Sequence, residues 1–100
     1  MEFNELQSRL WNNMLKTIED FRNGKIQYYD LVYELEGALD AGEFRDKELI
    51  KHWYDHWTPL EILSAKKGNN STIDDANEYL VVMEEYLRKM LSDYLSQEEE

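Results

Sequence analysis

The 100-residue sequence contains no cysteine, one proline and four glycines. Without cysteine the chain forms neither a disulfide nor a thiolate metal site, and a reducing compartment suits it. No apolar run approaches the roughly 20 residues that span a bilayer as a helix. The first residues lack the basic segment and the apolar run of a signal peptide. We therefore expect a soluble, cytoplasmic protein.

Basic residues are also scarce, with 11 Lys and Arg against 22 Asp and Glu and a net charge of −11. The excess is spread along the whole chain. A field of this sign repels nucleic acid phosphates and anionic lipids, and it attracts basic protein surfaces. The composition therefore favours a protein partner and argues against nucleic acid or membrane partners. The alternative interpretation is that the acidity only keeps a small protein in solution.

The residues that are present suit one helical domain over residues 1–100. Apolar residues make up 42% of the chain and aromatic residues 13%, which is enough for one core. Segments rich in Val, Ile and Thr with two-residue alternation are absent, so we expect no strands. The predicted fold class is all-α.

Apolar residues at three- and four-residue steps predict the first helices. One helix is expected over residues 2–23, ended by Gly24, and a second over residues 27–41, ended by Gly42. A third begins near residue 45. The expected inward-facing residues of these three helices are Phe3, Leu6, Leu10, Met14, Ile18, Phe21, Tyr28, Leu31, Val32, Leu35, Ala38, Leu39, Leu49, Ile50, Trp53 and Trp57.

The segment Thr58-Pro59-Leu60-Glu61 reads as a fresh helix start. Thr58 can cap, Pro59 suits the first helical position, and Glu61 can complete a capping box. We therefore expect a short helix from Pro59 to about Lys66. A proline kink within one longer helix is the alternative.

The last helix carries the most regular pattern. A loop over residues 67–71 precedes it, and Thr72 is expected to cap it. The residues predicted to form its inward seam are Ile73, Ala76, Leu80, Met83, Leu87, Met90 and Tyr94. Four main helices and one short helix, joined by short connections, predict an antiparallel helical bundle. Residues 96–100 are expected to fray.

The two histidines, His52 and His56, are four residues apart and could share a helix face around a metal ion. The zinc-protease pattern requires glutamate at position 53, where Trp53 stands. We therefore favour histidines at the border of the core making ordinary hydrogen bonds, with the metal site as the weaker alternative. Phosphate-binding glycine loops, cysteine nucleophiles and di-iron Glu-x-x-His pairs are missing. The sequence indicates a non-enzymatic protein without a cofactor.

Two surface stripes are candidate binding residues. On the second predicted helix, one stripe consists of Tyr29, Tyr33, Glu36, Asp40 and Glu43. Tyrosine rings interleaved with carboxylates suit a Lys- and Arg-rich protein surface. Tyr79 and Tyr86 form a second stripe beside the seam of the last helix. The alternative is that these tyrosines widen the core and the acids form a solvated face.

The order of these segments resembles the colicin D immunity-like family, small acidic proteins that protect bacteria from their own nuclease toxins. The resemblance lies in Phe21-x-x-Gly24-Lys25-Ile26 between two amphipathic helices, then in Leu60-Glu61-Ile62-Leu63-Ser64-Ala65, a polar loop, Asp74-Asp75 and a last amphipathic helix. The resemblance implies a non-enzymatic inhibitor whose carboxylates cover a basic nuclease active site. It transfers no individual inhibitory residues.

Three hypotheses follow. The first is an immunity- or antitoxin-type inhibitor that docks on a basic partner such as a nuclease toxin, as a monomer or a weak homodimer. The second is a structural or regulatory domain that self-associates through exposed aromatics such as Trp11, Tyr79 or Tyr86. The third is a metal-dependent hydrolase that uses His52 and His56.

Overall fold

In the computed structural model, residues 5–98 are described, with side chains described for residues 5–92. They form four α-helices, α1 (Glu5–Arg22), α2 (Tyr28–Ala41), α3 (Lys47–Lys67) and α4 (Ile73–Glu98). A single 3₁₀ turn, η1 (Gly68–Asn70), lies between α3 and α4. No strand occurs between residues 5 and 98, which confirms the all-α prediction.

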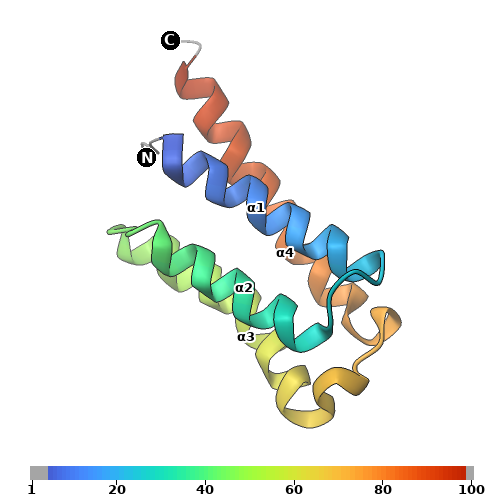
Figure 1. Cartoon of the computed structure of the whole chain (residues 1–100). Coiled ribbons are helices and arrows are strands. Elements are labelled where there is room, and N and C mark those ends of the chain that lie inside the picture. The colour runs from blue at the N-terminus through green and yellow to red at the C-terminus, as the bar shows by residue number, and fades with distance from the viewer. Residues whose placement is uncertain (1–4, 99–100) are drawn as a thin grey trace.

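Consecutive helices run in opposite directions along a body of 45 × 26 × 21 Å (Figure 1). Each helix contacts the next one in sequence, and α4 returns against α1. The ring of contacts closes the antiparallel bundle that the sequence predicted. Within the described part of the chain, no helix is both long enough and apolar enough to cross a lipid bilayer.

The core lies along the common interior of the four helices. Its largest fully buried side chains are those of Trp11, Trp53 and Tyr28. Trp11 was expected to be exposed, and that expectation is wrong, because its ring packs 4.7 Å from the ring of Phe44 inside the bundle. The buried apolar residues are Leu10, Trp11, Met14, Ile18, Phe21, Tyr28, Leu31, Val32, Leu35, Leu39, Leu49, Trp53, Trp57, Leu60, Ala76, Leu80, Met83, Leu87 and Met90.

The residues of the predicted apolar seams are buried or partly buried in this core, except at the ends of the seams. Leu6 is 53% exposed and Ile73 is 41% exposed, so both point to solvent instead of inward. Each belongs to the first turn of its helix, where fewer neighbouring helices are within reach. Phe3 lies outside the described residues, and Tyr94 lies outside those with described side chains.

The short helix predicted to begin at Pro59 does not exist as a separate element. Residues 47–67 form one continuous helix with Pro59 inside it, which agrees with the alternative of one longer helix; the kink of that alternative stays a prediction. Proline withdraws one backbone donor from the helix interior. On both sides of the proline α3 is bonded to α2, since the Trp57 indole donates to the Val32 carbonyl at 3.0 Å and the Tyr28 hydroxyl donates to the Leu60 carbonyl at 2.7 Å. Thr58 and Glu61 therefore lie within α3 and cap nothing.

The helix ends follow the sequence more closely. Thr72 caps α4 as predicted, because the Asp75 backbone N–H donates to its hydroxyl while its own N–H donates to the Asp75 carboxylate, both at 3.1 Å. At the end of α2, Gly42 has φ −76°, and the positive φ belongs to Glu43. A Cβ at position 42 would collide with the Phe44 ring, so a larger residue there would displace that ring.

Helix α4 ends at Glu98. The fraying expected over residues 96–100 stays a prediction. Residues 99 and 100 lie outside the described part of the chain.

Candidate protein-binding face

Tyr29, Tyr33 and Glu36 of the first predicted stripe line one pocket between α2 and α3. Its volume is about 280 Å³. The opposite wall comes from α3, which contributes Trp57, Glu61, Ser64 and Ala65. The stripe therefore borders a groove between two helices instead of lying alone on the outside of one.

The remaining predicted residues, Asp40 and Glu43, line a smaller pocket of about 140 Å³ along the same pair of helices. Tyr54 of α3 joins the two pockets. Its ring lines the smaller one, and its hydroxyl donates to Glu36 Oε2 at 3.1 Å. We call the surface formed by Tyr29, Tyr33, Glu36, Asp40, Glu43, Tyr54 and Glu61 the acidic face.

The two exposed tyrosines of the acidic face hold each other in place. The Tyr29 hydroxyl donates to the Tyr33 hydroxyl at 3.0 Å, and their rings meet edge to face at 4.6 Å. Donating this hydrogen bond raises the pKa of Tyr29. The backbone beneath is fixed as well, because the Tyr29 N–H donates to the side chain of Asn69 in η1 at 3.0 Å. Both residues remain open to solvent, with exposures of 49% for Tyr29 and 60% for Tyr33.

The carboxylates of the acidic face lack ion-pair partners within the part of the chain whose side chains are described. Helix α2 contains no Lys or Arg. Within residues 5–92, none of the carboxylates of Glu36, Asp40, Glu43 and Glu61 forms an ion pair. Partial burial, the hydrogen bond to Glu36 and the nearby negative charges together raise the pKa of Tyr54. The face therefore presents acceptors and negative charge to whatever approaches it.

The sequence interpretation missed Tyr54 and Glu61. These residues are seven positions apart, so they share one side of α3. From this spacing one could predict that the two residues lie on the same side of α3. The spacing does not predict that this side of α3 lies next to the tyrosine stripe of α2.

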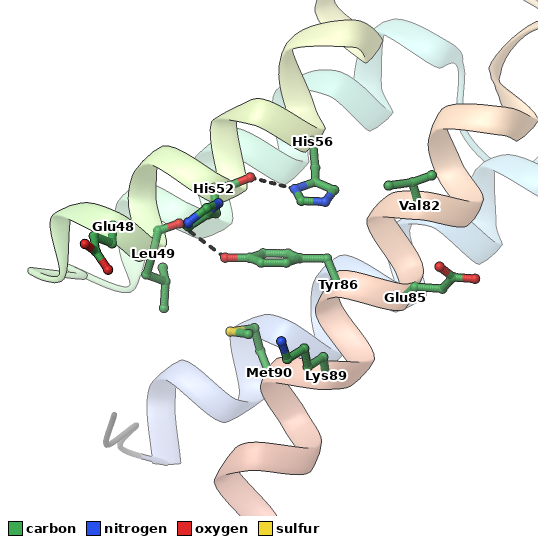
Figure 2. A pocket seen from close by; sticks show the side chains of 9 residues that line it. All are labelled: Glu48, Leu49, His52, His56, Val82, Glu85, Tyr86, Lys89 and Met90. Carbon is green, nitrogen blue, oxygen red and sulfur yellow. Dashed lines mark hydrogen bonds between the residues drawn. The ribbon is translucent and has the colours of Figure 1, made fainter.

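The second predicted stripe lies elsewhere and does not join the acidic face. Tyr79 is 37% exposed on α4. Tyr86 is half-buried in a pocket of about 490 Å³ between α3 and α4, with its hydroxyl donating to the Leu49 carbonyl at 3.2 Å (Figure 2). Burial, assisted by the charge of Asp46, raises the pKa of Tyr86 to about 12. The contacts of Tyr86 are thus mostly contacts within the fold.

Both histidines line the same α3–α4 pocket as Tyr86. The His56 ring stacks on the Tyr86 ring at 4.6 Å, and its Nδ1 lies 2.6 Å from the His52 carbonyl oxygen (Figure 2). A carbonyl only accepts, so Nδ1 carries the proton. Among the described side chains, no group of three or more His, Cys, Asp and Glu is arranged to hold a metal ion.

Comparison with known proteins assigns the chain to no family: no protein-family model, curated protein or solved structure matches it.

Proposed function

We propose that this chain is a non-catalytic binding protein that docks its acidic face on a basic protein surface. The observation that carries the proposal is a row of carboxylates that form no ion pairs within residues 5–92, next to two exposed tyrosines, along two neighbouring pockets between α2 and α3. A basic partner supplies the positive charges that these carboxylates lack within residues 5–92.

Among residues 5–92, the carboxylates that form ion pairs are those of Glu5, Asp75 and Glu84. The acidic face differs from the other carboxylates without ion pairs because two exposed tyrosines lie beside it. Leaving carboxylates close together without counter-ions costs free energy through mutual repulsion. The same field accelerates encounter with a positively charged surface and gives association a steep salt dependence.

The tyrosines supply the contact area. Tyrosine is enriched at the energetic centres of protein interfaces because its ring is large and its hydroxyl can bond at the rim. Since Tyr29 and Tyr33 already hold each other, little rotamer freedom is lost on binding.

Within this class, the partner we propose is a nuclease toxin, so the chain acts as an immunity- or antitoxin-type inhibitor. Nuclease active sites gather Lys and Arg around phosphate groups. Carboxylates at positions 36 and 40 are separated by about 6 Å of helical rise along α2, and Glu43 follows the end of that helix, so the three can occupy the place of a nucleic acid backbone. The sequence resemblance to immunity proteins agrees with this partner.

Quantitative capture with three immobilised forms of the chain tests the proposal. The forms are wild type, the face variant Glu36→Lys/Asp40→Lys/Glu43→Lys, and a control, Glu19→Lys/Glu34→Lys/Glu78→Lys, with the same change in net charge on exposed residues elsewhere. We expect one basic protein with a nuclease domain to be retained by wild type and control and lost with the face variant. Co-expression with that protein should protect cells only for the first two forms. Equal retention by all three would refute docking through this face.

Self-association through α4 is the second candidate function. It is favoured by three exposed residues on α4, Tyr79, Val81 and Val82, with exposures of 37%, 41% and 47%. Light scattering over a concentration series separates the candidates. A monomer at all concentrations excludes the second, whereas a dimer broken by Val82→Lys supports it.

A further inference from the structure

We propose that the 280 Å³ pocket of the acidic face receives one arginine side chain of the partner, with its guanidinium against the tyrosine rings and between Glu36 and Glu61. The inference rests on the proposed function and names the group that the face recognises.

The size and walls of the pocket suit a single long side chain. Small-molecule sites occupy roughly 300–1,000 Å³, so this pocket lies just below their range. Three of its lining residues are aromatic: Tyr29, Tyr33 and Trp57. Trp57 is only 6% exposed, and its indole is bonded to the Val32 carbonyl, so it forms a fixed part of the wall. The methylene stem of a long cationic side chain can lie along such a surface.

The two carboxylates approach from opposite sides. Glu36 comes from α2 and Glu61 from α3, and both line the pocket. The Tyr54 hydroxyl donates a hydrogen bond to Oε2 of Glu36 and so orients the carboxylate. No cation of the chain itself is paired with either group in the part that the structure describes. The pocket therefore has two acceptor groups ready for one cation.

Arginine fits this arrangement better than lysine. Its guanidinium is planar, stacks on aromatic rings and offers five N–H donors in a fixed fork, so that it can bond two carboxylates at once. The ammonium of lysine is a compact, strongly hydrated point charge and gains less from aromatic walls. The guanidinium is also less strongly hydrated than the ammonium, so less hydration is lost when it enters the pocket.

Peptide titrations monitored by NMR of the ¹⁵N-labelled full chain test the inference without the partner. The probes are acetyl-Gly-Gly-X-Gly-Gly-amide with X as arginine, lysine or citrulline, the neutral isostere of arginine. We expect saturable shifts at pocket residues such as Tyr33, Glu61 and Ser64 with the arginine peptide. Its affinity should exceed that of the lysine peptide by about 2- to 5-fold, as expected for a cation on exposed aromatic rings. The citrulline peptide should not bind.

Single variants then locate the site. Glu61→Gln and Tyr33→Ala should each weaken binding of the arginine peptide by at least about 3-fold. Glu34→Gln is the matched control, since it removes the same charge as Glu61→Gln from an exposed position of α2 outside the pocket. Circular dichroism verifies that each variant is folded, and Glu61→Gln, on the exposed side of α3, tests the pocket independently of Tyr33→Ala.

Two results would overturn the inference. Equal affinity for arginine and lysine peptides, with shifts spread over Asp40 and Glu43, would show charge attraction without an arginine pocket and would leave docking on a basic partner intact. Absence of saturable binding to wild type would remove the pocket, while the capture experiment judges the proposed function separately.

Discussion

The two sides of the bundle use carboxylates in opposite ways. On the α1–α4 side, Glu84 is 9% exposed and contacts two cations, Arg22 from α1 and Arg88 from its own helix. Arg22 donates a further hydrogen bond to the Asn77 side chain at 3.1 Å. On the α2–α3 side, the carboxylates of the acidic face have no cation within the described residues. The nearly buried acid between two helices is thus paired, whereas within residues 5–92 the acids of the acidic face are not.

The comparison separates charge that stabilises the fold from charge that is available to a partner. A nearly buried carboxylate must be paired, because an isolated charge out of water is costly. An exposed carboxylate carries no such requirement, and its contribution to folding is small. The four predictions that follow test this division from the largest expected effect to the smallest.

Glu84→Ala should lower the free energy of unfolding by about 1–3 kcal/mol, because it leaves Arg22 partly buried without its partner. Urea denaturation at neutral pH measures the loss. Glu78→Ala, on the exposed surface of the same helix, is the matched control and should change stability by less than about 0.5 kcal/mol. Similar losses for both variants would mean that the α1–α4 pair is not structural.

Tyr28→Phe should cost about 1 kcal/mol, because it removes a buried hydroxyl that bonds the Leu60 carbonyl across α2 and α3. Tyr33→Phe, five residues further along α2 on its exposed side, removes an exposed hydroxyl and should cost less than about 0.5 kcal/mol. Chemical denaturation of both variants makes the comparison. The division between core and face on α2 fails if Tyr33→Phe is the more damaging change.

Stability should decline at alkaline pH through the buried tyrosines. Burial raises the pKa of Tyr86 to about 12, and burial together with the charge of Tyr79 raises that of Tyr28 further. Above pH 10 the unfolded chain releases protons that the folded chain retains, so stability is present below pH 10 and lost as pH rises toward 12. Denaturation between pH 8 and 11.5 measures the slope, which Tyr86→Phe should reduce. An unchanged slope in that variant would contradict the contribution of the buried Tyr86 hydroxyl to the pH dependence of stability.

Neutralising the acidic face should have the smallest effect on folding. Glu36→Gln/Asp40→Asn relieves repulsion around Tyr54 and should leave the free energy of unfolding unchanged or raise it by up to about 0.5 kcal/mol. A thermal melt at low and high salt checks this, with the difference from wild type shrinking as salt rises. A clear loss of stability would assign these carboxylates to the fold.

The spacing of apolar residues predicted most of the architecture, because it determines which side of each helix packs against the others. The seam from Ala76 to Met90 on α4 is buried as predicted. The local signals around Pro59 favour a helix start, whereas the structure has one continuous helix that is bonded to α2 on both sides of the proline. Such contacts come from residues distant in sequence, and local patterns do not report them.

The candidate site was half predictable for a similar reason. The stripe from Tyr29 to Glu43 could be recognised on one helix. Its other wall, with Tyr54 and Glu61, depends on which side of α3 packs toward α2. The prediction for Trp11 was wrong in the other direction. Trp11 lies beside the predicted seam and was expected to be exposed, but Phe44 from a loop covers it.

The most direct test of the account is the affinity of the captured basic partner for the two triple variants, measured by calorimetry in the same buffer. We predict that Glu36→Lys/Asp40→Lys/Glu43→Lys binds at least about 100-fold more weakly than wild type, as expected when several complementary charges are reversed at an interface. Glu19→Lys/Glu34→Lys/Glu78→Lys, with the same net charge, should stay within about 10-fold of wild type. Equal losses for the two variants would show that only the overall charge matters and would contradict a specific acidic face.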